Sequence, residues 1–181
     1  MQNIKIIGLA GPKGVGKTTI AKELARKIGP SCWSQVFSFA DPIRNMARAF
    51  GLSDFQLSDT KEKEKVIEGL GISPREFMQR IGTDFGRSIS KDVWIHAMEQ
   101  RIKGEMCYWD VLTVIIDDVR FDNEAEFIRA HGGKVFELGR DDVEYTSEHS
   151  SEAGINPVLI DCVIEADCID YAVHSILAEK D

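Results

Sequence analysis

Short apolar runs alternate along the chain with segments whose apolar residues recur every three or four positions. Five runs have the length and composition of strands: 4–10, 35–40, 112–116, 134–138 and 162–165. Apolar stripes of helical spacing lie between them, and Ile20, Leu24 and Ile28 form the first. This alternation predicts a three-layer α/β fold with a mostly parallel five-stranded sheet and helices on both faces.

Capping residues mark where two of the predicted helices begin. Residues 41–42, DP, follow the second predicted strand with an acidic cap and a proline in the first turn. Residues 73–76, SPRE, have the spacing of a capping box. After it, Phe77, Ile81 and Phe85 recur at every fourth position, which predicts a buried stripe. Further helices are predicted over 93–102, from residue 122 or 123 to 130, and over 169–177.

Two segments depart from this pattern. Residues 53–71 are rich in charge and carry little core pattern, so we expect a solvated surface excursion there, with a mobile flap as the alternative. Residues 141–157 are polar and contain no strand pattern. We expect His149 in this segment to be an exposed loop residue, with a place in a lid as the alternative.

Residues 11–18, GPKGVGKT, join the first predicted strand to the first predicted helix and match the pattern GxxxxGK[ST]. Glycines at these spacings let successive backbone N–H groups turn toward a di- or triphosphate, and the helix start adds its positive dipole end. In such a loop Lys17 would reach the outer phosphates, and the Thr18 hydroxyl would ligate Mg²⁺. The spacing therefore predicts a nucleotide-binding loop.

Charged residues gather at the ends of the other predicted strands. They are Asp41 and Arg44 after the second strand, Asp117, Asp118 and Arg120 after the third, and Arg140 after the fourth. Ligands of doubly wound sheets bind at the carboxyl ends of the strands, so we expect these residues to converge with the loop. Such a group of residues is typical of phosphoryl transfer, in which positioning and charge neutralisation supply most of the catalysis.

The two adjacent aspartates are alternative metal ligands. We expect Asp117 or Asp118 to hold Mg²⁺, directly or through water, and the sequence leaves the choice open. For each candidate arginine, the alternative to a role in the site is that of an ordinary surface charge. An arginine at the transition state contributes ~10³–10⁵ in rate, whereas an exposed ion pair contributes ~0–1 kcal/mol, so mutation would separate the two roles.

Composition restricts the class of protein further. The 181 residues suffice for one domain with a full core. A net charge of -8 disfavours nucleic acid polymers, which require a basic surface, but is compatible with small nucleotides. No apolar run approaches the ~20 residues of a membrane span, and the cysteines form no CxxC pair, which favours free thiols. We therefore expect a cytoplasmic protein with no membrane partner.

Several blocks occur in an order known from one family. They are GLAGPKGVGKTTIA, FSFADPIRNMA, SPREFMQRIGTDFGR followed by DVWI, IIDDVRFDNEAEFI and the late SEHSSE. In these blocks the chain resembles the deoxynucleoside monophosphate kinases of the bacteriophage type, within the P-loop nucleoside monophosphate kinase superfamily. The resemblance implies one P-loop kinase domain over 1–181, with a helical acceptor-side insertion at 53–104 and a lid-like segment at 140–157.

The same resemblance implies an activity and assigns residues to it. The terminal phosphoryl group of ATP would pass, with Mg²⁺, to a deoxynucleoside 5′-monophosphate, in the host cytoplasm if the protein is phage-encoded. The ATP phosphates would be held by Gly11, Lys13, Gly14, Val15, Gly16, Lys17, Thr18 and Thr19. The acceptor would be bound by Asp41, Arg44, Arg80, Thr83, Asp84 and Arg87, with Trp94 as a base contact or a packing residue. Lys17, Arg120 and Arg140 would be catalytic, and Thr18, Asp117 and Asp118 are the candidates for the metal.

Two other classes of protein share part of these features. One is another small-molecule P-loop kinase resembling dephospho-coenzyme A kinase, and the other is a nucleotide-dependent switch with no small acceptor. The sequence has no NKxD-type guanine motif and no DxxG after the third predicted strand, which disfavours the switch. The base and sugar preference for the acceptor stay open. An exposed helix face could support a homodimer.

Overall fold

The computed structural model describes residues 3–29, 33–109, 111–141 and 154–179. The chain divides into two compact units, one formed by residues 1–38 and 98–181 and the other by residues 39–97. The second unit begins at Phe39, earlier than the acceptor-side insertion expected from residue 53. The first unit contains the sheet, and the second is helical.

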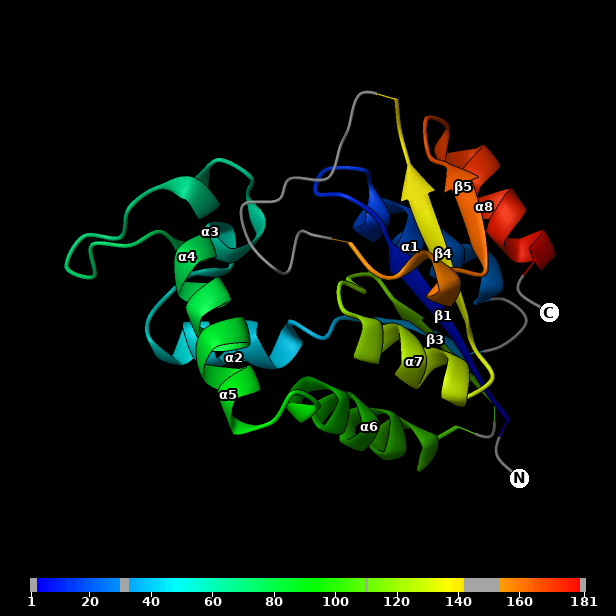
Figure 1. The fold of residues 1–181 in the computed structure, drawn as a ribbon, viewed down its shortest axis with the longest axis horizontal. Coiled ribbons are helices and arrows are strands. Elements are labelled where there is room, and N and C mark those ends of the chain that lie inside the picture. Colours follow the sequence, from blue (N-terminus) through cyan, green and yellow to red (C-terminus); the bar gives the residue numbers. More distant parts are fainter. Residues whose placement is uncertain (1–2, 30–32, 110, 142–153, 180–181) are drawn as a thin grey trace. The chain divides into compact units, whose positions relative to one another are not determined.

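Five strands form one sheet in the first unit (Figure 1). They are β1 (Asn3–Ala10), β2 (Trp33–Phe37), β3 (Val111–Ile116), β4 (Lys134–Gly139) and β5 (Cys162–Glu165). Their order is β2-β3-β1-β4-β5, and every neighbouring pair is parallel. The predicted parallel five-stranded sheet is therefore confirmed.

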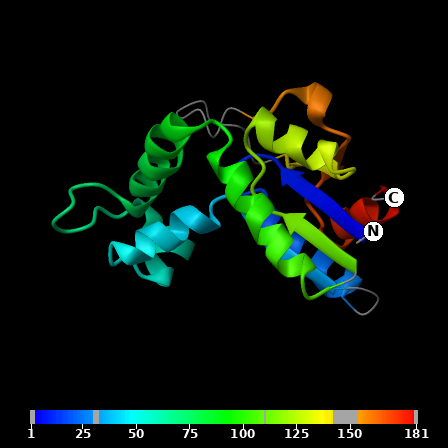
Figure 2. The same cartoon turned by 90° about the horizontal axis from the view of Figure 1, so that it is seen from below.

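Helices cover both faces of this sheet (Figures 1 and 2). They are α1 (Lys17–Ile28) and α8 (Ile169–Glu179) on one face and α7 (Asp122–Ala130) on the other. Successive residues of a strand point to opposite faces. Accordingly Ile7 and Leu9 of β1 belong to one apolar core with α1 and α8, whereas a Cβ on Gly8 would lie 2.5 Å from Ile128 of α7. The predicted layering is thus confirmed.

Strand β2 differs in its bounds from the predicted run 35–40. It ends at Phe37, which pairs with Ile116, the last residue of β3. Beyond that point β3 offers no further ladder partner, and Ala40 already has helical backbone angles. The next helix, α2 (Asp41–Ala49), therefore has Ala40 as its N-cap, and Asp41 lies in its first turn rather than at the cap.

The second unit has a small apolar core of its own. Its helices are α2, α3 (Asp54–Ser58), the short 3-10 helix η1 (Glu62–Glu64), α4 (Pro74–Gln79), the π-helix η2 (Arg80–Gly86) and α5 (Arg87–Ile89). Ala47, Leu52, Leu57 and Phe77 are buried together, and Ile67 packs against them. The expectation of a solvated excursion over 53–71 is therefore wrong for Leu57 and Ile67, which pack in or against this core.

The stripe predicted after residue 76 is confirmed for Phe77 and for Ile81, which packs against the same core, and is wrong for Phe85. Phe77 is buried, but Phe85 is 58% exposed, and Gly82 and Gly86 are buried instead. The reason is the π-helical turn, whose i→i+5 hydrogen bonds rotate the downstream residues relative to an α-helix. Helix α6 (Val93–Met106) follows and buries Trp94, Met98 and Ile102 in the predicted register.

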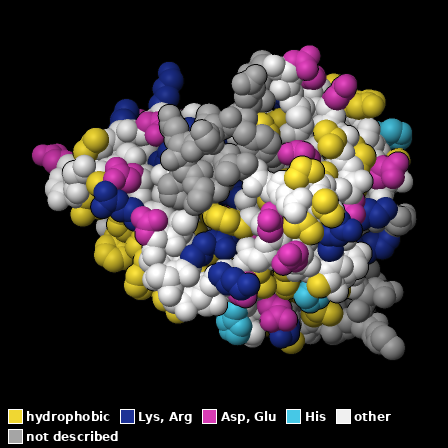
Figure 3. Space-filling view, in the orientation of Figure 1, with side chains coloured by type: hydrophobic (Ala, Val, Ile, Leu, Met, Phe, Trp, Pro, Cys, Tyr) yellow, Lys and Arg dark blue, Asp and Glu magenta, His cyan; other side chains and the backbone are white. Residues whose placement is uncertain are grey.

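The surface carries both signs of charge. Figure 3 shows acidic and basic side chains interspersed over the face in view. Cys107, Cys162 and Cys168 are free thiols, as the spacing predicts. Within the described residues, every helix is too short or too polar to cross a membrane.

Candidate active site

The loop between β1 and α1 depends on its glycines. Gly11, Gly14 and Gly16 have φ values of 130°, 87° and 101°, a region that side chains disfavour. Gly11 also lies against β4, where a Cβ would be 2.4 Å from the Leu138 carbonyl oxygen. Val15 is 1% exposed within the core, so its side chain anchors the loop and only its backbone could contact a ligand. The loop is thus a backbone structure held on an apolar anchor.

Two residues at the start of α1 place polar side-chain groups beside this loop. The ammonium group of Lys17 donates hydrogen bonds to the carbonyl oxygens of Gly11 and Pro12, at 2.6 and 2.8 Å. The Thr18 hydroxyl donates to Oδ2 of Asp117 at 2.7 Å, across 99 positions of sequence. The loop and the end of β3 therefore meet, as the sequence predicts.

The sheet register explains this meeting. Gly8 of β1 and Phe37 of β2 both pair with Ile116 of β3. Because the strands are parallel, the segments that follow these residues leave the sheet at the same edge. Asp117 and the glycine loop therefore lie at one edge, together with Ser38, the first residue after β2.

The adjacent aspartates have different partners. Asp117 is 7% exposed and accepts the hydrogen bond from Thr18. Asp118 is half-buried and accepts a short hydrogen bond from the Ser38 hydroxyl. Asp117 thus connects the end of β3 to the phosphate-binding loop, whereas Asp118 connects the end of β3 to the end of β2. The role of Ser38 was missed from the sequence because no motif marks it.

The segment carrying Arg120 is fixed by a buried carboxylate that the sequence analysis also missed. Glu124 is 3% exposed, and its Oε2 accepts hydrogen bonds from the backbone N–H groups of Arg120 and Phe121, at 2.9 and 3.2 Å. The N-cap of α7 is Phe121 rather than Asp122 or Asn123. A Glu three residues after the cap was the available signal, but phenylalanine at the cap obscures the usual capping-box pattern.

Arg140 follows β4 and lies near the carboxylate that follows β5. Its Nε is 3.9 Å from Oδ1 of Asp167, and about one third of its side chain is exposed. Most of the lid-like segment, residues 142–153, lies outside the described residues, as does His149. A lid role for this segment stays a prediction.

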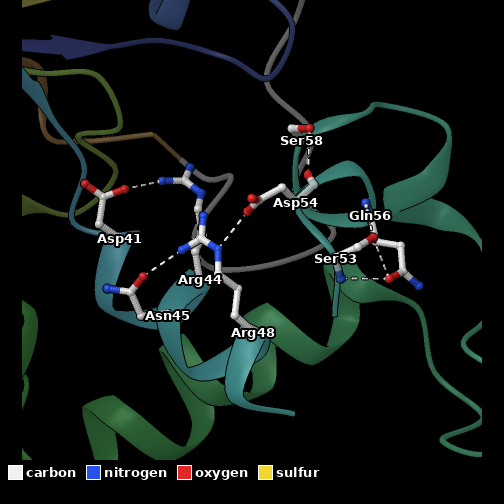
Figure 4. A network of polar contacts seen from close by, with 8 residues as sticks. All are labelled: Asp41, Arg44, Asn45, Arg48, Ser53, Asp54, Gln56 and Ser58. Atoms are coloured by element: carbon white, nitrogen blue, oxygen red, sulfur yellow. Dashed lines mark hydrogen bonds and ion pairs between the residues drawn. The ribbon is translucent and has the colours of Figure 1, made fainter. Parts of the chain in front are cut away.

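In the second unit, charged residues of α2 form a polar network (Figure 4). Arg44 donates to Oδ1 of Asp41 at 2.8 Å, one helical turn earlier. One turn later, Arg48 donates to Asn45 and to Asp54, at 2.6 and 2.7 Å. The guanidinium of Arg44 is thus held on its own helix, and about 28% of its side chain is exposed.

The other predicted acceptor residues lie on or beside the π-helix η2. Arg80 is exposed and donates to Glu76 at 2.6 Å, and Arg87 donates to the Lys91 carbonyl at 3.0 Å. Thr83 is half-buried and Asp84 is exposed. Trp94 is different, because its ring is buried and its indole N–H donates to the Gly82 carbonyl at 2.7 Å. Of the two roles left open for Trp94, its environment is that of a packing residue.

The donor set at Thr18 and Asp117 suits a hard cation. Mg²⁺ prefers oxygen ligands and binds through one or two protein groups together with phosphate oxygens and water. A hydroxyl and a carboxylate in contact beside a loop rich in positive-φ glycines provide such ligands. The fold and this site together define a P-loop protein of the kinase type.

Comparisons with known proteins agree with this class. Shikimate kinase from Aquifex aeolicus has the same fold, with a TM-score of 0.52 and 11% identity over 96% of this chain and 94% of that one. A protein of Acanthamoeba polyphaga mimivirus, named as a deoxynucleotide monophosphate kinase, is 32% identical over 84% of this chain and 83% of its own length. The deoxynucleoside-5′-monophosphate kinase of Escherichia phage T5 is 25% identical over 68% of this chain and 71% of its own.

Residues 48–173 match the deoxynucleotide monophosphate kinase family. The chain therefore belongs to this family and is an enzyme, a kinase. The match begins beyond residues 11–18, so the glycine loop is a separate observation that agrees with it.

Proposed function

We propose that the protein transfers the terminal phosphoryl group of ATP, with Mg²⁺, to a deoxynucleoside 5′-monophosphate, giving ADP and the diphosphate. Family membership supports the class of reaction and of acceptor. The observation that carries the donor side is the hydrogen bond between Thr18 and Asp117, which joins the glycine loop to the end of β3.

The donor phosphates would bind to the loop. Backbone N–H groups of Gly11 and of residues 13–19, together with the N-terminus of α1, supply the positive potential for the anion. Lys13 and Lys17 add charge, and Lys17 already lies over the loop through its bonds to Gly11 and Pro12. A phosphate oxygen is a stronger acceptor for an ammonium group than a carbonyl, so ATP would draw Lys17 from these carbonyls.

Thr18 and Asp117 would hold the metal ion. Asp118 would have a separate, structural task, because its hydrogen bond to Ser38 ties the end of β3 to the end of β2. When bound, Mg²⁺ neutralises phosphate charge and orients the donor. Buried Asp117 contributes a fixed oxygen whose position is set by Thr18, which limits the reorganisation needed when the nucleotide binds.

The acceptor would be bound by the second unit. Asp41 and Arg44 on α2 and Arg80, Thr83, Asp84 and Arg87 on η2 and α5 supply guanidinium groups for a phosphate and polar groups for the sugar and base. Arginine suits this role because its planar fork can donate two hydrogen bonds to one phosphate.

Arg120 would stabilise the negative charge of the transferred group. Its backbone is fixed by Glu124, which reduces the freedom of the segment that presents the guanidinium. Arg140 is the second candidate for this role, with its ion pair to Asp167 as a competing contact.

A coupled assay of ADP release tests the proposal. We expect ATP and Mg²⁺ to give ADP faster when a deoxynucleoside monophosphate is added, and the corresponding ribonucleotides would define the sugar preference. Dephospho-coenzyme A serves as the control acceptor for another small-molecule kinase. An ADP rate that no acceptor changes would contradict the proposal and favour a nucleotide-dependent switch.

A further inference from the structure

A buried side chain from outside the π-helix η2 hydrogen-bonds to its backbone. Trp94, near the start of α6, donates its indole N–H to the carbonyl oxygen of Gly82 at 2.7 Å, and both groups are buried. A buried hydrogen bond of this kind is costly to lose, because the carbonyl oxygen loses this donor in a site that water does not reach readily. Trp94 therefore fixes a backbone group in the middle of η2.

Two glycines let η2 fit closely around this contact. A Cβ on Gly86 would lie 2.2 Å from Cζ2 of Trp94, and a Cβ on Gly82 would lie 2.7 Å from Cδ1 of Ile43. Any larger residue would push the helix from the indole ring or from α2. The two glycines are four positions apart, so they lie on one face of η2, and that face packs against Trp94 and Ile43.

The close packing decides which side chains face outward. With Gly82 and Gly86 on the buried face, Phe85 becomes 58% exposed, although an α-helical stripe would bury it. A π-helical turn is rare and marks functional sites more often than chance. Thr83, Asp84 and Arg87 lie in or directly after this turn, so their direction depends on it.

We propose that Trp94 is a positioning residue for the acceptor: its indole N–H, through the Gly82 carbonyl, holds residues 80–86 in the π-helical form that presents Thr83 and Arg87. This inference rests on the proposed function for the identity of the acceptor. Trp94 does not touch the base in this role, since its ring is buried between Gly86 and the Gly82 carbonyl.

The variant Trp94→Phe tests it, because phenylalanine keeps an aromatic ring and removes the donor. We expect amide hydrogen exchange of residues 80–89, measured without any ligand, to rise on the order of tenfold. We also expect KM for every deoxynucleoside monophosphate to rise by a similar factor, on the order of tenfold, with kcat and KM for ATP unchanged. Gly86→Ala, which places a methyl group against the ring, should change both quantities in the same direction.

Trp109→Phe is the matched control. Trp109 stacks on Trp33 at 3.9 Å in the first unit, so its replacement should change neither quantity. Unchanged exchange of residues 80–89 in Trp94→Phe would overturn the proposal whatever the activity. Raised exchange with unchanged KM would overturn the positioning role, and a KM effect confined to one base would assign Trp94 to the base instead. A wild-type enzyme without acceptor-dependent turnover would overturn the proposed function. The exchange measurement would still show whether the indole hydrogen bond stabilises η2.

Discussion

At the scale of single residues, Asp117 and Asp118 show how neighbouring carboxylates acquire separate tasks. Successive side chains of an extended segment point to opposite sides, so two adjacent aspartates rarely serve one ligand in the same way. Here Asp117 contacts Thr18 of the glycine loop, and Asp118 contacts Ser38 after β2. The sequence could not distinguish them, because the distinction depends on which neighbouring strand each side chain faces.

Replacing each aspartate by asparagine separates these tasks. Asp117→Asn should lower kcat on the order of 10²-fold or more and raise the Mg²⁺ concentration needed for half-maximal rate, because a charged ligand is lost. Asp118→Asn keeps an acceptor for Ser38 and should leave the Mg²⁺ dependence unchanged. Steady-state rates across a Mg²⁺ titration measure both. The opposite ranking of the two variants would assign the metal to Asp118.

Arg120 gives a second prediction at this scale. Arg120→Ala should lower turnover on the order of 10²-fold or more, because a guanidinium at the transition state is worth far more than a surface ion pair. Arg26→Ala is the matched control, since Arg26 is an exposed residue of α1 paired with Glu23. Initial rates at saturating substrates make the comparison. A loss below about tenfold, or an equal loss in both variants, would place Arg120 among ordinary surface charges.

At the scale of elements, long regular patterns were predictable and short irregular ones were not. The strands were found because each contains a short, mainly apolar run, and α1 and α8 because their stripes repeat over several turns. The segment 53–71 was misjudged because only Leu57 of the short helix α3 is buried. A single buried residue in a charged stretch produces no periodicity. The π-helical turn was equally hidden, since a spacing of four fits an α-helix as well.

Helix α3 permits a direct test of the small core. Leu57→Ala should reduce the free energy of unfolding by about 2–5 kcal/mol, because Leu57 is 2% exposed and packs in the core of the second unit. Phe55→Ala is the control on the same helix, where the side chain is 61% exposed and the expected change is within about 0.5 kcal/mol. Urea unfolding curves measure both. Equal, small changes in the free energy of unfolding for the two variants would contradict the buried core and support the solvated excursion that the sequence suggested.

At the scale of the whole molecule, the two units carry different parts of the proposed reaction. The loop, Asp117 and Arg120 belong to the first unit, and Arg44 and Arg87 belong to the second. The donor side was predictable because one contiguous motif marks it. The acceptor side depended on family resemblance. Of the residues that support the two sites, Trp94 bonds to Gly82, 12 positions earlier, in a contact that no sequence pattern marks. Glu124 bonds to backbone groups only three and four positions earlier, but the phenylalanine at the cap obscured the pattern.

This division predicts that substrate affinities can be changed separately. Arg44→Ala should raise KM for the deoxynucleoside monophosphate about 10- to 100-fold, because a charge-assisted contact to phosphate is lost, and leave KM for ATP unchanged. Arg48→Ala, one turn further along α2 and bonded to Asn45 and Asp54, should change neither. Initial rates with each substrate varied in turn decide the matter. A rise in KM for ATP in Arg44→Ala would place Arg44 on the donor side.

The central claim is that a phosphoryl group passes from ATP held by the glycine loop to a deoxynucleoside monophosphate. Its most direct measurement uses ATP labelled on the γ-phosphate and separates the products by chromatography. We predict labelled deoxynucleoside diphosphate with the wild type and none with Lys17→Ala. Circular dichroism should show that Lys17→Ala keeps its fold. Lys22 is an exposed residue of α1, so the control variant Lys22→Ala should transfer the label normally. Label released only as inorganic phosphate, or near-normal transfer by Lys17→Ala, would contradict the account.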